Sequence, residues 1–140
     1  MAAQTIFTGE DTVVPEGTSH EYACRFVEAS GAVLELAAIT SIALWLDDVR
    51  TGTAINSRTN VDVLDDNGGT LEDDADGALF TMSFDPADAV IVTQPPSGPP
   101  VPPRVEQHRI TLKVGYNKTG GGTGQLTHEV LYRVRSFPRI

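Results

Sequence analysis

Residues 105–137 read VEQHRITLKVGYNKTGGGTGQLTHEVLYRVRSF, and this stretch decides the fold class. Apolar and polar side chains alternate on both sides of a glycine-rich centre, which is the period of a β-strand with one buried face. The residues expected on the buried face are Ile110, Leu112, Val114, Tyr116, Leu126, Val130, Tyr132 and Val134. Residues 117–124 predict the flexible tip that joins the two strands. We therefore expect a long antiparallel hairpin at the end of the chain.

Shorter segments with the same alternation precede this hairpin. Strands are expected over residues 21–28, 40–47 and 78–84. Asp76-Gly77 predicts a hairpin turn between residues 70–72 and 78–84. Asp85-Pro86 predicts the N-cap and the first position of one or two helical turns. Many short strands with a single helical turn indicate an all-β fold, an antiparallel β-sandwich of seven or eight strands.

The length of 140 residues, 40% of them hydrophobic, predicts one domain with a buried core. Residues 1–18 are expected to form an N-terminal arm or edge strand, weakly held because Ile6 and Phe7 are its only large apolar anchors. Residues 19–140 then form the sandwich. A proline-rich loop at 94–104 holds six prolines between residues 95 and 103, and we expect it to run as extended polyproline II.

Charge is divided unevenly along the chain, whose formal net charge is −9. Residues 1–103 contain 3 Lys/Arg and 17 Asp/Glu, whereas residues 104–140 contain 7 Lys/Arg and 2 Asp/Glu. An acidic domain is repelled by nucleic acid and by anionic membranes, so neither is an expected partner. The basic tail suits the acidic part of a neighbouring copy. Alternatively, the opposite charges simply occupy adjacent strands of one sheet.

The acidic residues between positions 65 and 76 are the first candidate for metal binding, because carboxylates are calcium ligands. They are Asp65, Asp66, Glu72, Asp73, Asp74 and Asp76. Their spacing does not fit an EF-hand loop, and turns rich in Asp and Gly explain them equally well. No metal site is predicted.

The chain offers no recognisable catalytic constellation. If Tyr116 pairs with Leu126 in the hairpin, His108 and His128 lie roughly 20 Å apart at ~3.3 Å per residue, so they share neither a metal nor a proton. His20 and these two residues are therefore expected to be structural or surface histidines. Cys24 falls inside a strand as a small buried side chain, and Trp45 is expected in the core. We expect no enzyme activity and no cofactor.

Neither a secretory leader nor a membrane span is expected. The first residues, MAAQTIFTGED, lack a basic region followed by an apolar run, and no apolar stretch is long enough to span a membrane. Asn117-Lys118-Thr119 matches a glycosylation acceptor, but no feature of the sequence indicates secretion.

The run from Leu36 to Asn67, LAAITSIALWLDDVRTGTAINSRTNVDVLDDN, resembles an immunoglobulin-like family of small structural proteins encoded by tailed bacteriophages and prophages. Members carry an ITSLTLTLYD strand, a TGTVIN turn and a VLNANGG segment, whose counterparts are residues 39–42, 51–56 and 63–69. The likeness continues at residues 78–88, 106–109 and 128–137 and departs in the loops at 95–103 and 120–124. It implies an immunoglobulin-like sandwich and a non-enzymatic virion component.

The resemblance leads to an expected function. The chain would be a virion structural protein, foremost a capsid decoration protein that acts through protein–protein contacts and is assembled in the bacterial host cytoplasm. A neck, head–tail connector or tail and baseplate adaptor is the alternative, and a carbohydrate- or cell-surface-binding module is the second. The expected partners are the major capsid protein or neck and tail proteins, together with copies of itself. An N-terminal arm that adds a strand to a neighbour would supply one such contact.

Overall fold

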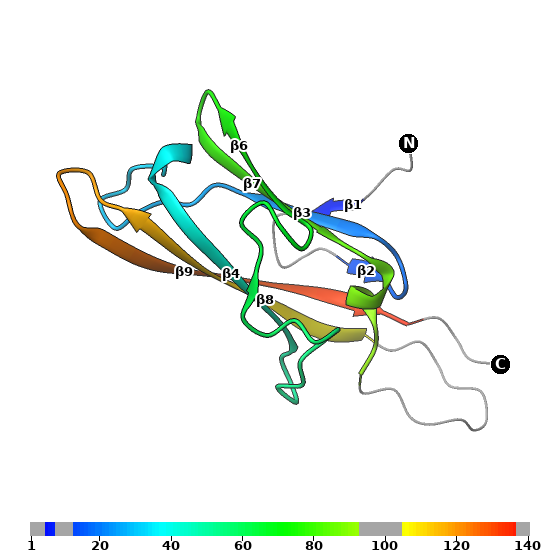
Figure 1. The fold of residues 1–140 in the computed structure, drawn as a ribbon. Helices are drawn as coiled ribbons and strands as arrows, with labels where there is room; N and C mark the ends of the chain where they lie inside the picture. The colour runs from blue at the N-terminus through cyan, green and yellow to red at the C-terminus, as the bar shows by residue number, and fades with distance from the viewer. Residues whose placement is uncertain (1–4, 8–12, 93–104, 137–140) are drawn as a thin grey trace, which may run out of the picture.

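The computed structural model describes residues 5–7, 13–92 and 105–136, which form two packed β-sheets (Figure 1). One sheet has four strands in the order β1-β3-β7-β6, and the other has five in the order β2-β9-β8-β4-β5. The strands are β1 (Thr5–Phe7), β2 (Val13–Pro15), β3 (His20–Cys24), β4 (Ile39–Asp48), β5 (Val61–Asp62), β6 (Gly69–Asp74), β7 (Gly77–Phe84), β8 (Val105–Asn117) and β9 (Thr123–Arg135). Two short 3-10 turns, η1 (Leu36–Ala38) and η2 (Pro86–Ala89), complete the described elements.

The expectation of an all-β sandwich is confirmed. The neighbours β3-β7-β6 and β9-β8-β4 repeat the strand order of the two sheets of an immunoglobulin domain. Two details differ from the expectation. The described chain has nine strands rather than seven or eight, and β1 and β2 pair in parallel with β3 and β9. All the other strand pairs are antiparallel.

The N-terminal segment contributes an edge strand to each sheet. Val14 in β2 is fully buried, so Ile6 and Phe7 are not the only large apolar residues available to hold the segment. The expectation of two anchors failed because a single valine, flanked by exposed neighbours, gives no periodic signal. The side chains of Ile6 and Phe7 and the whole proline-rich loop at 94–104 lie outside the described residues.

The long C-terminal hairpin is confirmed, but its expected register is wrong by two residues. Tyr116 pairs with Gly124 rather than with Leu126, and the last pair joins Asn117 to Thr123. The tip is therefore shorter than the glycine-rich sequence indicated. A Cβ atom at Gly124 would lie 2.6 Å from the ring of Tyr116, so any other residue here would force the tyrosine ring to shift.

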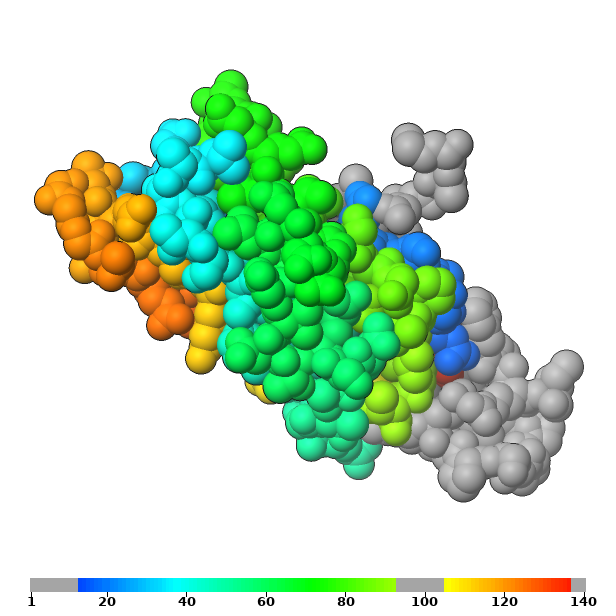
Figure 2. All heavy atoms as spheres, viewed as in Figure 1, coloured from blue at the N-terminus to red at the C-terminus, as the bar shows by residue number. Residues whose placement is uncertain are grey.

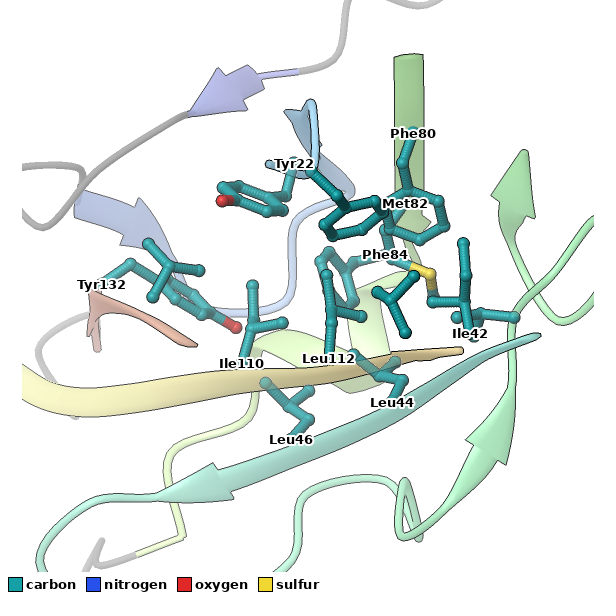
Figure 3. Packing of buried hydrophobic residues seen from close by; sticks show 14 of the residues in the cluster. Tyr22, Ile42, Leu44, Leu46, Phe80, Met82, Phe84, Ile110, Leu112 and Tyr132 are labelled. Carbon is teal, nitrogen blue, oxygen red and sulfur yellow. The ribbon is translucent and has the colours of Figure 1, made fainter. Parts of the chain in front are cut away.

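The core lies between the sheets, where the alternating residues of both meet (Figure 3). Tyr22, Phe80 and Phe84 come from the four-stranded sheet, and Leu44 and Leu112 face them from the other. All five are at most 2% exposed. Burying a side chain of this size contributes roughly 1.5–3 kcal/mol, so this layer is the main stabilising feature of the fold.

The turn signals between the strands are also confirmed. Gly77 opens β7 with φ +113°, a backbone conformation that side chains disfavour. Asp85 caps η2 by accepting a hydrogen bond from the amide of Ala87, and the side chain of Asp88 returns a bond to the amide of Asp85. The chain between β4 and β6 (blue-green to green in Figure 2) runs across the flank of the sandwich that faces the viewer.

Candidate functional site

The most accessible candidate site is the solvent side of the five-stranded sheet, here called the outer face and defined by Trp45, Asp47, Arg109, Lys113 and Arg133. These residues come from the neighbouring strands β4, β8 and β9, with Asp47 opposite Arg109. Part of this face is an open hollow of about 260 Å³. The expectation that Trp45 belongs to the core is therefore wrong. Trp45 alternates with the buried Leu44 and Leu46, and alternation along β4 sends it to solvent.

The polar groups of the outer face hold each other in place. Arg109 donates two hydrogen bonds to the carboxylate of Asp47, at 3.1 and 2.8 Å. This pairing raises the pKa of Arg109 above its ordinary value. The ammonium group of Lys113 lies 5.0 Å from the centre of the Trp45 ring, a cation–π distance. The outer face therefore offers one aromatic ring in contact with a lysine, beside the ion pair of Asp47 and Arg109, which is chemistry suited to a polar partner surface.

The acidic residues between positions 65 and 76 serve the turns of the other sheet. Asp65 accepts a hydrogen bond from the amide of Leu71, and Asp74 accepts from the amide of Asp76. Asp74 also pairs with Arg25 at 2.9 Å. Over the described ranges, none of the six acids belongs to a group of at least three converging potential metal ligands. These contacts favour the turn interpretation over calcium binding.

A first buried polar cluster joins the loop after β4 to η2. The carboxylate of Asp88 is fully buried, and each of its oxygens accepts two hydrogen bonds, from Arg58, Asn56 and the amide of Asp85. Burial alone would raise the pKa of Asp88, but the hydrogen bonds from Arg58 and Asn56 outweigh it and hold that pKa below its ordinary value. The guanidinium of Arg58 lies 5.9 Å from the centre of the Phe84 ring. Both oxygens of the Asp88 carboxylate therefore have hydrogen-bond donors within the protein.

A second buried polar cluster lies where β4 ends and β8 begins, at the opposite end of β8 from the hairpin tip (Figure 1). It consists of Asp48, Glu106 and His108, whose potential ligand atoms all lie within 4.8 Å of one another. Sequence reasoning missed Asp48 and Glu106. Glu106 and His108 have the same parity as Ile110 in β8, which was a usable signal, whereas the contribution of Asp48 depends on its pairing opposite His108.

The three histidines are buried or partly buried and occupy two separate environments. His20 stacks on Phe84 at 4.8 Å, and His108 meets Tyr132 edge-on at 5.8 Å. His128 instead pairs across the sheet with Leu112 and hydrogen-bonds the hydroxyl of Tyr22. Burial lowers the pKa of His20 and of His128, which favours the neutral ring in both.

Cys24 is partly buried and packs against the core, close to its expected role. Burial raises the pKa of its thiol to about 12. A thiol with so high a pKa carries almost no thiolate at neutral pH, so it is a poor nucleophile.

Two further findings complete the description of the site. Within the described ranges, no helix has the length and apolar character needed to cross a bilayer. Comparison of the chain with protein-family models, curated proteins and solved structures found no match.

Proposed function

We propose that this protein is a non-enzymatic structural component of a tailed-phage virion, foremost a capsid decoration protein. The family resemblance of residues 36–67 is the reason for naming a virion. The observation in the structure that supports a binding role is the outer face, where Trp45 contacts Lys113 of the neighbouring strand β8 beside the ion pair of Asp47 and Arg109. A neck, connector or baseplate adaptor remains the alternative position on the particle.

Charge supplies the second argument for a surface that binds protein. Arg133 and Arg135 are exposed on β9, whereas Glu72 and Asp73 are exposed on the hairpin of the other sheet. A head-to-tail neighbour would bring surfaces of opposite sign together, which favours association and orientation. The partners proposed are therefore other virion proteins, the major capsid protein first, and further copies of this chain.

The decisive experiment is the copy number of this protein in purified particles, measured by quantitative mass spectrometry against the major capsid protein. A stoichiometry comparable to the capsid protein supports decoration of the head. A single ring's worth of copies supports the neck or tail alternative, and absence from particles contradicts a virion role.

The outer face is tested by Lys113→Glu, which reverses the charge beside Trp45. Incorporation into particles should fall, because the surface then repels an acidic partner. Arg50→Glu is the matched control, since Arg50 is an exposed base in the turn after β4, away from the outer face. Equal incorporation of both variants would contradict binding through this face.

The N-terminal segment is tested by deleting residues 1–10. Loss of incorporation with a folded domain would support strand addition to a neighbour, the mode in which backbone hydrogen bonds provide affinity. Val14 remains in the truncated chain and continues to fill its buried position beside β9. Normal incorporation would contradict a role for the arm.

Binding of a carbohydrate is the second candidate function, and the outward position of Trp45 favours it. Exposed aromatic rings are the usual platforms on which sugars stack. Tyr116 is only 6% exposed and is not such a platform. A glycan array would test this candidate, with binding expected for the wild type and lost in Trp45→Ala. No binding by the wild type would contradict it.

A further inference from the structure

The cluster of Asp48, Glu106 and His108 combines two carboxylates and an imidazole almost completely removed from solvent. Their relative exposures are 1%, 5% and 0%. Asp48 lies directly opposite His108 on the paired strands β4 and β8, and Glu106 precedes His108 by two residues on the same face. Two adjacent strands therefore fix the positions of all three side chains from the backbone.

The hydrogen bonds of Asp48 and His108 leave one buried polar atom of each residue unused. One oxygen of Asp48, Oδ2, accepts from the amide and the hydroxyl of Thr51, at 2.9 and 2.6 Å. Oε1 of Glu106 lies 2.5 Å from Nε2 of His108 and accepts from the amide of Val92 at 3.0 Å. Oδ1 of Asp48 and Nδ1 of His108 are buried and have no hydrogen-bond partner.

A buried carboxylate oxygen without a partner lowers the stability of the fold, because it has lost its hydrogen bonds to water and forms none within the protein. The ion pairs of the described residues include none between Asp48 and a lysine or arginine. A cation bound between Asp48, Glu106 and His108 would remove that cost. No other group of three or more potential ligands converges in the described part of the chain.

We propose that Asp48, Glu106 and His108 form a structural binding site for a divalent transition-metal ion, with Zn²⁺ as the best fit. Zinc accepts imidazole and carboxylate ligands at roughly 2.0–2.2 Å. The ligand atoms of a tetrahedral zinc ion lie roughly 3.5 Å apart, so any pair at the 4.8 Å limit of this cluster would have to approach by about an ångström when the ion binds. The imidazole ligand disfavours calcium and magnesium, which prefer oxygen alone.

The bound ion would tie together three parts of the chain that are distant in sequence. It would link the end of β4 to the start of β8, and through Glu106 it would also fix the backbone at Val92 after η2. The site is buried, so an external substrate has little access to the ion, and a second carboxylate oxygen or a water would have to supply the fourth ligand of the zinc.

The test uses the full-length protein after treatment with a chelator and titration with ZnCl₂. Isothermal titration calorimetry should show one equivalent bound, and the thermal unfolding midpoint should rise with zinc. In Asp48→Asn the affinity should fall by about a hundredfold or more, since even supporting residues of metal sites are worth 10–100-fold. The amide oxygen of this variant still accepts from Thr51, so the turn keeps its hydrogen bonds.

Asp47→Asn is the matched control, because Asp47 is the preceding residue but faces the opposite side of the sheet, paired with Arg109. It should bind zinc like the wild type. Failure of the wild type to bind zinc, or equal weakening by both substitutions, would overturn the proposal.

A measurement on the wild type alone keeps the test independent of how the variants fold. X-ray absorption at the zinc edge should show a first shell of nitrogen and oxygen that includes one imidazole. A shell of oxygen alone would indicate binding to surface carboxylates and would also overturn the proposal.

Discussion

The two buried polar clusters of this sandwich each contain a buried aspartate, but they differ in how many of its oxygens accept hydrogen bonds. Around Asp88, a guanidinium, an amide side chain and a backbone amide fill both oxygens of the carboxylate. Around Asp48, only one oxygen is filled, and a ring nitrogen of His108 is also left without a partner. The comparison teaches that burial alone does not give a charged group its role. The unfilled atoms distinguish a place for a ligand from a finished structural contact.

The largest expected effect is that of Asp88→Ala, which leaves Arg58 nearly buried without its carboxylate. Breaking a buried ion pair from one side costs about 3–5 kcal/mol, and we expect a loss of that size in the free energy of unfolding. Urea denaturation measures it. Asp85→Ala is the control, because it removes the hydrogen bond that caps η2, worth about 1 kcal/mol, and a long one from Asn56 at 3.5 Å, but leaves the ion pair of Arg58 and Asp88 in place. Equal losses in the two variants would contradict a large stabilising contribution from the buried ion pair of Asp88 and Arg58.

Acid should weaken the protein through the same carboxylate. The folded-state pKa of Asp88 is lowered, so its contribution is complete above the unfolded value of about 3.9 and is lost as pH falls through the folded pKa. The difference in unfolding free energy between wild type and Asp88→Asn should therefore be constant at neutral pH and shrink below about pH 4. Denaturation curves at a series of pH values measure it, and a difference that stays constant down to the lowest pH would contradict this role.

The histidines cause a separate loss of stability in acid, which occurs in the wild type and in Asp88→Asn. Burial lowers the pKa of His20 and of His128 in the folded protein. Below about pH 6.5 these histidines are therefore protonated in the unfolded chain before they are protonated in the folded chain. Stability should therefore begin to fall below that pH. This loss cancels for His128 in the difference between wild type and Asp88→Asn, whereas for His20 it cancels only in part, because the charge of Asp88 offsets some of the lowering of the His20 pKa by burial.

Asp48→Asn should behave in the opposite way to Asp88→Asn in metal-free buffer. The substitution keeps an oxygen to accept from Thr51 and removes a charge whose other oxygen has no partner. We expect the free energy of unfolding to stay within about 1 kcal/mol of the wild type. A loss of several kcal/mol under these conditions would mean that the carboxylate is satisfied after all, and the contrast between the clusters would disappear.

The smallest effect is expected on the outer face. Asp47→Asn weakens a partly exposed ion pair with Arg109, and such pairs contribute less than about 1 kcal/mol. The loss should shrink further at high salt, because exposed charges are screened. Urea denaturation at low and high salt measures both. A loss as large as that of Asp88→Ala would contradict the expectation that the exposed pair of Asp47 and Arg109 contributes less than the buried pair of Asp88 and Arg58.

The sequence predicted the elements better than their pairing. Alternation along residues 105–116 placed Ile110, Leu112 and Val114 on the buried face, and they are fully buried. The register of the hairpin was wrong because the turn lies inside a longer glycine-rich run, so composition alone did not fix which residues close it. Trp45 was assigned to the core from its type, although the alternation of its own strand sends it outward.

What the sequence by itself determined is local: the strand periodicity, the Asp76-Gly77 turn, and the cap that Asp85 and Asp88 give to η2. These depend on residues a few positions apart, whose conformational preferences act without the rest of the chain. Only the tertiary structure decided the strand order, the parallel edge pairing of β2, and the meeting of Asp48 with Glu106 and His108. These depend on which distant strands share a sheet and in which register, and such contacts form only when the whole core is buried together.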